Sequence, residues 1–164
     1  ITSEDTPSFG GVYKLSAIMK NGEFVPKMKL SDNPWKITNP GNKKIYRIYE
    51  KESGKVKADL ITLAEEHYSP ENPLLLFDPL ATWKKTYLDP NSYTLRELLV
   101  PIFISGECVY ESPSVMEIKD YCTKEQDTLW DEARRLVNPH NVYVDLSQKL
   151  YQLKTHLLND HSNK

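Results

Sequence analysis

The sequence predicts an α+β fold, in which an antiparallel sheet built from hairpins is followed by C-terminal helices packed on it. Apolar runs of strand length, separated by turn-forming residues, fill the first two-thirds of the chain. In the last third the apolar residues recur every three or four positions, which is the period of an amphipathic helix. All strand-like segments precede all helix-like segments, and that order favours α+β over an alternating α/β fold.

A first hairpin is expected near the N-terminus. Val12–Met19 is rich in apolar and β-branched residues, as strands are, and Asn21-Gly22 follows it. An Asn-Gly pair tolerates the positive φ angles of a two-residue hairpin turn. Glu23–Leu30 is therefore expected to return beside the first strand. The turn-forming residues of Ser31–Asn42 then indicate a loop.

A second hairpin is expected where Lys43–Glu50 and Lys55–Leu63 flank the turn-forming pair Ser53-Gly54. Apolar and polar residues alternate along the returning strand, and this alternation is typical of a half-buried antiparallel strand. The residues expected on its buried face are Val56, Ala58 and Leu60.

The middle of the chain contains shorter elements. Leu74–Phe77 and Thr82–Leu88 are strand-sized runs broken by Asp-Pro pairs, and Thr94–Leu98 fits a helical turn or a strand equally well. Val100–Ile104 and Glu107–Tyr110 flank a Ser-Gly pair, which predicts a third hairpin.

The last third predicts helices. Ser114 and Glu117 form a capping-box pattern, in which each side chain accepts a hydrogen bond from the other residue's backbone N–H. Thr123 is a possible break between two helices, and Pro139 ends the pattern because proline disfavours helix at the residue before it. The apolar residues of this stripe are Val115, Ile118, Cys122, Leu129, Ala133, Leu136 and Val137.

A final amphipathic helix is expected after Asp145. Asp145 and Gln148 repeat the capping pattern, with Asp145 as the cap. The apolar residues that follow at helical spacing are Leu146, Leu150, Leu153 and Leu157.

Charge and composition exclude several classes of protein. The chain has 21 basic and 23 acidic side chains, a net charge of −2, whereas a nucleic-acid-binding protein carries a basic excess. No apolar run approaches the roughly 20 residues of a membrane span, so no membrane partner is expected. Cys108 and Cys122 lack any metal-binding or disulfide-framework spacing and indicate reduced thiols in a cytoplasmic protein. The polar stretch Ile1–Asp5 does not resemble a signal peptide.

The residues alone indicate no self-contained active site. The four histidines have no metal-ligand spacing, so no metal site is expected. No serine lies in a nucleophile-elbow motif. Phosphate binding favours a glycine-rich turn before a helix, but the only close glycine pair, Gly10-Gly11, precedes a strand-like segment.

Several stretches resemble the nicotinate phosphoribosyltransferase family. Phe9–Leu15 is similar to the family's "GGVYKL" strand, and Met28–Ser31 with Trp35–Gly41 is similar to its "KLS…EKIT.PG" segment. Ile45-Tyr46-Arg47 is similar to its "VYR". Further similar stretches follow in the same order at similar spacing: Ala58–Ile61, Pro113–Val115, Leu129–Glu132, Arg135–His140 and Val144–Ser147.

The resemblance implies a reaction and its partners. The family joins nicotinate to phosphoribosyl pyrophosphate, gives nicotinate mononucleotide and pyrophosphate, and couples this step to ATP hydrolysis through a phosphorylated histidine. Its members are much longer than this chain, use ATP and Mg²⁺, and form their active sites in a homodimer. The implied partner is therefore the remainder of the enzyme, which comprises a barrel and an N-terminal domain.

The same resemblance implies how the chain is organised. Residues 1–20 would be the closing strand and arm of the phosphoribosyltransferase barrel, and residues 21–164 the C-terminal domain. No catalytic residue of the family matches a position here, so the isolated chain is expected to bind no cofactor and to be inactive. Gly10, Gly11 and Lys14 are the substrate-adjacent candidates, because they follow the position of the barrel's phosphate-binding loop.

Two alternatives stay open. The chain is an independent accessory or ligand-binding α+β module, or it comes from a nicotinamide- or quinolinate-specific relative. The first alternative has a structural signature. A piece of a larger enzyme should expose an apolar patch along Phe9–Ile18, whereas an independent module should be closed there.

Overall fold

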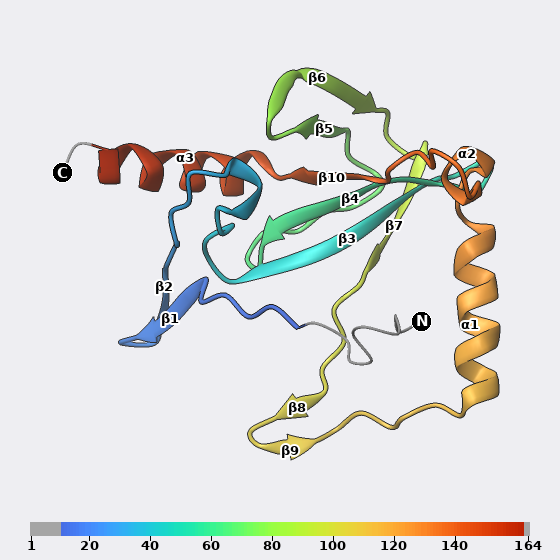
Figure 1. The fold of residues 1–164 in the computed structure, drawn as a ribbon, viewed down its shortest axis with the longest axis horizontal. Coiled ribbons are helices and arrows are strands. Elements are labelled where there is room, and N and C mark those ends of the chain that lie inside the picture. The colour runs from blue at the N-terminus through green and yellow to red at the C-terminus, as the bar shows by residue number, and fades with distance from the viewer. Residues whose placement is uncertain (1–10, 163–164) are drawn as a thin grey trace. The chain divides into compact units, whose positions relative to one another are not determined.

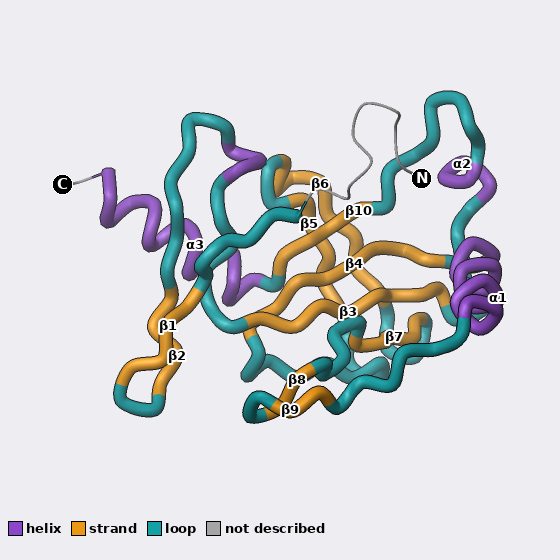
Figure 2. Tube along the Cα trace, turned by 60° about the horizontal axis from the view of Figure 1, so that its bottom comes forward, coloured by secondary structure: helices purple, strands orange, loops and turns teal. Residues whose placement is uncertain are grey.

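The computed structural model describes residues 11–162 (Figures 1 and 2). The chain divides into two compact units: Ile1–Asn42 with Leu153–Lys164, and Lys43–Gln152. The expected boundary between residues 20 and 21 stays a prediction. The α+β class is confirmed, because hairpins occupy the first two-thirds and the helices lie in the last third, where one strand also returns to the sheet between the second and third helices.

The first unit contains the expected N-terminal hairpin. Strand β1 (Ala17–Lys20) pairs antiparallel with β2 (Glu23–Pro26). Asn21 and Gly22 have φ angles of 53° and 83°, so both turn residues adopt the left-handed conformation that the Asn-Gly pair predicts. Both strands are shorter than the sequence indicates, because residues 11–16 and 27–30 have no neighbouring strand in the described part of this unit.

A four-stranded sheet forms the centre of the second unit, in the order β10-β4-β3-β7. Strand β10 runs parallel to β4, and the other pairs are antiparallel. The sheet is therefore mixed, since the chain returns to it after the helices. The strands are β3 (Lys43–Glu50), β4 (Val56–Leu63), β7 (Tyr93–Glu97) and β10 (Tyr143–Leu146).

Two segments of this sheet resolve or correct the sequence prediction. The undecided stretch Thr94–Leu98 is largely strand, because β7 pairs with the outer edge of β3. Asp145 and Leu146 belong to β10 and not to a helix. Pairing with β4 supplies backbone hydrogen bonds that the local capping pattern does not reveal.

The core lies between this sheet and the hairpin formed by β5 (Leu74–Asp78) and β6 (Ala81–Leu88). Alternate residues of β4 are buried, as the sequence predicts. The hairpin contributes apolar side chains to the same cluster, and burying that surface is the main gain of folding. The cluster comprises Tyr46, Ile48, Ala58, Leu60, Leu74, Leu76, Leu88 and Tyr93.

The third expected hairpin is present but short. Strands β8 (Phe103–Ile104) and β9 (Glu107–Cys108) flank a turn in which Ser105 and Gly106 both have positive φ angles. Each strand has two residues, and the apolar side chains around the turn remain exposed because residues 11–162 provide no layer that covers them.

The capping box of the first helix is confirmed. Ser114 Oγ accepts a hydrogen bond from the Glu117 backbone, and the Glu117 side chain accepts one from the Ser114 backbone. Helix α1 (Val115–Asp127) runs through Thr123, whose hydroxyl donates to the Lys119 carbonyl within the helix. The break follows at Thr128, and the short helix α2 (Asp131–Arg134) comes next.

The apolar stripe of this region does not pack as a helix–sheet interface. Helix α1 has no buried residue, and α2 ends before Leu136 and Val137, which are both exposed. The apolar residues therefore do lie on a helix, but none of the residues 11–162 buries the apolar face of α1.

Helix α3 (Gln148–Ser162) begins two residues later than the capping pattern indicates. Its cap is Ser147, whose Oγ accepts a hydrogen bond from the Leu150 backbone at 3.1 Å. The same hydroxyl donates to the buried Glu66 carboxylate. Asp145 cannot serve as the cap because β10 holds it in the sheet.

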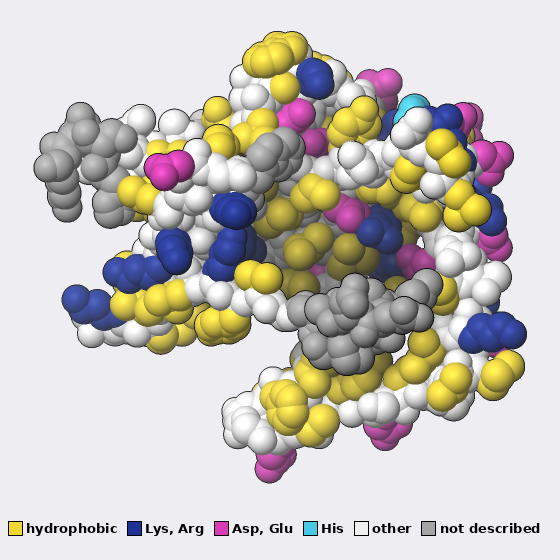
Figure 3. All heavy atoms as spheres, viewed as in Figure 1, with side chains coloured by type: hydrophobic (Ala, Val, Ile, Leu, Met, Phe, Trp, Pro, Cys, Tyr) yellow, Lys and Arg dark blue, Asp and Glu magenta, His cyan; other side chains and the backbone are white. Residues whose placement is uncertain are grey.

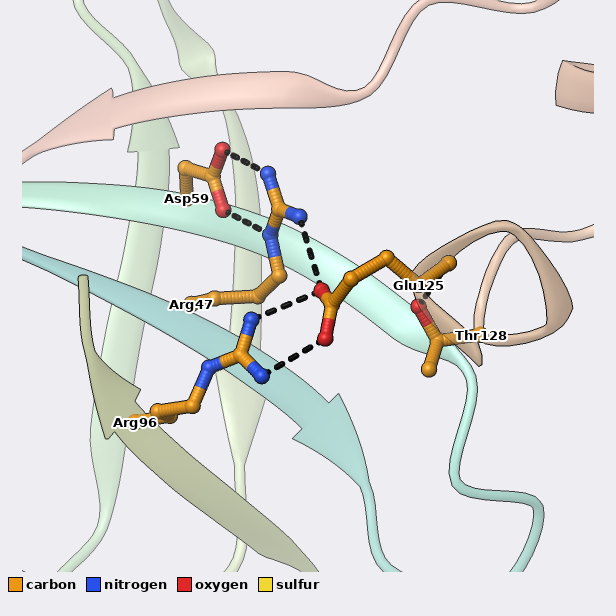
Figure 4. A network of polar contacts seen from close by, with 5 residues as sticks. All are labelled: Arg47, Asp59, Arg96, Glu125 and Thr128. Atoms are coloured by element: carbon orange, nitrogen blue, oxygen red, sulfur yellow. Dashed lines mark hydrogen bonds and ion pairs between the residues drawn. The ribbon is translucent and has the colours of Figure 1, made fainter. Parts of the chain in front are cut away.

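Ion pairs hold α1 against the sheet (Figure 4). Arg96 on β7 donates two hydrogen bonds to the Glu125 carboxylate, both of 2.7 Å. Arg47 on β3 forms a bidentate pair with Asp59 on β4, at 2.8 and 2.9 Å, and lies 3.7 Å from Glu125. The Arg96 guanidinium holds the pKa of Glu125 below its ordinary value.

Backbone contacts reinforce this attachment at the C-terminal end of α1. The Val56 N–H donates to the Thr128 carbonyl at 2.8 Å, and the Trp130 indole N–H donates to the Val56 carbonyl at 2.8 Å. Lys55 Nζ donates to the carbonyls of Asp127 and Leu129. A cation is favourable there because the helix dipole leaves negative charge at the C-terminus.

Replacing Glu125 with glutamine tests whether charge holds α1 in place. Because α1 buries no side chain, we expect the free energy of unfolding to fall by about 1–2 kcal/mol, between the values for exposed and buried ion pairs. Urea denaturation measures the loss, and amide hydrogen exchange should show faster exchange in α1. Asp120→Asn removes an exposed charge from the same helix and is the control. Equal stability of the two variants would contradict this account.

Candidate functional site

The sequence-predicted candidates lie at the start of the first unit. Gly10 lies outside the described residues. Gly11 has no neighbouring atom within 4 Å of the place where a Cβ would stand, so space around it does not require glycine. Lys14 is exposed, and its ammonium group donates to the Lys36 carbonyl at 2.9 Å. A role for these residues beside a substrate stays a prediction.

The expected apolar patch is present over the described part of Phe9–Ile18. Phe9 itself lies outside the described residues. Val12 and Tyr13 are 86% and 92% exposed, and Leu15 is about half exposed. Apolar side chains that follow one another at such exposure are typical of an interaction surface.

Histidines and acidic residues do not gather into a metal site. Between residues 11 and 162, no group of three or more His, Cys, Asp or Glu side chains is placed to hold a metal ion. The His140 backbone N–H donates to the Glu132 carbonyl, and His156 lies 3.4 Å from Asp160 on the exposed side of α3. No helix in the described part of the chain is long and apolar enough to cross a membrane.

A cleft of about 510 Å³ opens within the second unit. One wall is the face of β4 and β10, where Ala58 and Asp145 lie. The β5–β6 hairpin forms a second wall, which contains Phe77. The segment around α2, with Trp130, forms the third. The volume is in the range of small-molecule and side-chain binding sites.

Asp145 is the unusual residue of this cleft. It is only 6% exposed, and its carboxylate has no hydrogen-bond or ion-pair partner in the described part of the chain. It pairs in register with Leu60, so its side chain lies on the core side of the sheet. Burial, and then the nearby Asp78 carboxylate, raise the pKa of Asp145 to about 6.

Asp145 was not among the residues predicted to be functional, because its spacing to Gln148 fits a helix cap. The alternation of Tyr143, Val144, Asp145 and Leu146 was the available signal for a strand. The pairing of Arg47 with Asp59 was not predicted either. Their register could be inferred, since they lie on the two strands of one hairpin.

The raised pKa of Asp145 predicts an unusual pH dependence of stability. Above pH 6 the folded protein holds a buried charge that the unfolded chain exposes to water. Below about pH 4 the carboxyl is protonated in both states and this cost disappears. Lowering the pH from 8 to 5 should therefore stabilise the protein through this group, by roughly 1.4 kcal/mol.

Urea denaturation at pH 8 and pH 5 measures this effect. The stability difference between the two pH values should shrink in Asp145→Asn and persist in Asp89→Asn, which removes an exposed carboxylate. The window lies above the region in which Glu125 and other carboxylates with lowered pKa values lose their charge. An identical pH response in wild type and Asp145→Asn would rule out the explanation.

Comparison with known proteins shows which family has a similar sequence and fold. The family model described as "Nicotinate phosphoribosyltransferase C-terminal domain" matches residues 42–154. A crystal structure of human nicotinic acid phosphoribosyltransferase aligns with a TM-score of 0.60 and 26% identity, over 73% of this chain and 23% of the other.

Relatives from distant organisms carry the same name. Nicotinate phosphoribosyltransferases of Bacillus subtilis and Caenorhabditis elegans are each 34% identical to this chain, over 94% and 93% of its length, and the human protein is 31% identical over 93%. The chain spans only 31%, 26% and 27% of these three proteins. The chain belongs to the nicotinate phosphoribosyltransferase family, in which it corresponds to the C-terminal domain.

Proposed function

We propose that this chain is the C-terminal part of an enzyme that joins nicotinate to phosphoribosyl pyrophosphate, with hydrolysis of ATP. The observation that carries the proposal is the match of residues 42–154 to the family's C-terminal domain, in a chain that spans about a third or less of its relatives. The relatives' names supply nicotinate and the transfer of a phosphoribosyl group, and the family resemblance of the sequence adds the hydrolysis of ATP. Within the enzyme, this domain would stiffen the structure beside the barrel and contribute to contacts between parts.

The isolated chain is proposed to be inactive. Transfer of a phosphoribosyl group needs preorganised donors and cations around the reacting centre. The guanidinium groups of Arg47 and Arg96 are already engaged with Asp59 and Glu125. Lys14 donates to a main-chain carbonyl. These cations serve the scaffold, and we assign the binding of ATP and Mg²⁺ to the rest of the enzyme.

The proposed partner is the remainder of the same enzyme, in a homodimer. Exposed apolar side chains support this assignment, because patches of this kind mark interfaces. One set follows Gly11, and another surrounds the β8–β9 hairpin, where Figure 3 shows hydrophobic side chains gathered. The second set comprises Val100, Ile102, Phe103, Ile104, Val109 and Tyr110.

These surfaces argue against the alternative of an independent module, which would bury such residues within its own fold. The relatives reported above are named for nicotinate and not for nicotinamide or quinolinate. Both cysteines are free thiols, which supports a cytoplasmic location because that compartment keeps thiols reduced.

An activity assay tests the proposed reaction. The 164-residue chain, given nicotinate, phosphoribosyl pyrophosphate and ATP, should form no nicotinate mononucleotide, because it lacks a set of groups that stabilise the transferred charge. A protein of the relatives' length that ends in this chain should form it. Parallel assays with nicotinamide and quinolinate are the controls. Turnover by the isolated chain would refute inactivity, and preference for nicotinamide or quinolinate would refute the proposed substrate.

The exposed hairpin offers a second test. Phe103→Ser should change the stability of the isolated chain by less than about 0.5 kcal/mol, as exposed substitutions generally do. In the longer protein the same substitution should lower the melting temperature or the dimer fraction, because Phe103 would lie in an interface. Calorimetry and sedimentation measure the two effects, and the isolated variant is the matched control. No change in the longer protein would argue against this interface.

A further inference from the structure

The cleft of the second unit contains a carboxylate whose charge no residue between 11 and 162 neutralises. Other carboxylates that are removed from water in this unit have partners. Asp59 pairs with Arg47, Glu125 pairs with Arg96, and Glu66 accepts hydrogen bonds from the Leu63 backbone and two hydroxyls. Asp145 is as deeply buried as Glu66 and has no such partner in the described chain.

A carboxylate that is largely removed from water and has no protein partner is costly unless water or an external group reaches it, and the oxygens of Asp145 are not among the fully enclosed polar atoms of the described chain. The raised pKa of Asp145 reflects that cost. Because Asp145 lines the cleft, a group that enters from outside can reach it. The favourable entrant is a positively charged donor, since charge-assisted hydrogen bonds are the strongest type.

The charged groups around the cleft define the electrostatics that such an entrant would meet. Asp78 lies close enough to raise the pKa of Asp145. None of the lysines that line the cleft lies within ion-pair distance of Asp145. The charged or titratable residues in the lining, besides Asp145, are Lys57 on β4, Asp78 on β5, Lys84 and Lys85 on β6, Glu132 on α2, and His140 and Tyr143 after it.

The uncharged walls suit a cation attached to an apolar stem. Ala58, Leu76 and Phe77 contribute apolar side chains to the lining. Trp130 also lines the cleft, and its indole N–H bond to the Val56 carbonyl fixes the orientation of the ring. A guanidinium group stacks favourably on an indole face, and its methylene stem packs against apolar side chains.

We propose that this cleft binds a guanidinium or ammonium group, whose positive charge pairs with the Asp145 carboxylate while its stem packs against Phe77 and Trp130. The cation has two possible sources with the same chemistry. It is either a free small molecule or an arginine or lysine side chain from another part of the assembled protein.

Nuclear magnetic resonance of the 164-residue chain with methylguanidinium chloride tests the site directly. The Asp145 carboxyl and the Trp130 indole N–H signals should shift saturably, with half-saturation at about millimolar concentration for so small a probe. The pKa of Asp145 should fall from about 6 towards its ordinary value. Sodium chloride at equal ionic strength is the control and should not reproduce the shift.

Two variants separate a specific site from general attraction. Asp145→Asn should weaken binding of methylguanidinium at least about tenfold, because it removes the paired charge. Asp78→Asn removes another carboxylate of the same cleft and should have a smaller effect. Equal binding by wild type and Asp145→Asn overturns the proposal. If Asp145→Asn does not fold, the test is the pKa of Asp145 in the wild-type chain. A pKa that saturating methylguanidinium leaves unchanged overturns the proposal.

A second experiment distinguishes a free cation from a protein side chain. It rests on the proposed function, because it repeats the titration with the longer enzyme. If a protein side chain fills the cleft there, the pKa of Asp145 is already low and methylguanidinium does not bind. If the natural cation is a free molecule, the pKa stays near 6 and the probe lowers it. A pKa near 6 that the probe leaves unchanged in both proteins refutes the site. Loss of nicotinate activity alone would refute only the proposed reaction.

Discussion

Strand β4 lies between β3 and β10, and its residues alternate between two environments. On one face Val56, Ala58 and Leu60 are buried, so they supply the core and one wall of the cleft. The other face presents Asp59 to Arg47 and, through that guanidinium, to Glu125 of α1. A shift of register by one residue would exchange the two faces. The core, the cleft and the attachment of α1 therefore depend on the same two-residue period.

Three carboxylates in this unit illustrate how position decides the behaviour of one chemical group. Asp59 and Glu125 lie opposite guanidinium groups on neighbouring strands, and their charges hold elements together. Asp145 lies on the opposite face, among apolar side chains and near Asp78, and its charge is disfavoured. The first two serve the scaffold. The third lines the cleft without a hydrogen-bond or ion-pair partner in the described chain, and this is the reason for proposing it as a binding group.

The apolar surfaces fit a domain that functions within a larger protein. Helix α1 buries no side chain, and the β8–β9 hairpin presents its apolar residues outward. In a domain that functions by itself, such surfaces would promote aggregation. In a family whose members are about three or four times as long as this chain, the remainder of the protein can cover them. The helical stripe that the sequence displays is then explained by an interface and not by the core of this domain.

The class of fold, three of the hairpins, the buried face of β4 and the capping box of α1 could be predicted from the sequence, because these features arise from patterns within a few neighbouring residues. The family resemblance could be read there as well. The tertiary structure was needed to show that β5 pairs with β6, that β10 joins the sheet parallel to β4, that Arg96 reaches Glu125, and that Asp145 is buried without a partner in the described chain. The last three of these depend on segments far apart in the chain. Local sequence patterns do not reveal contacts between distant segments, because distant backbone and side-chain partners can override local preferences.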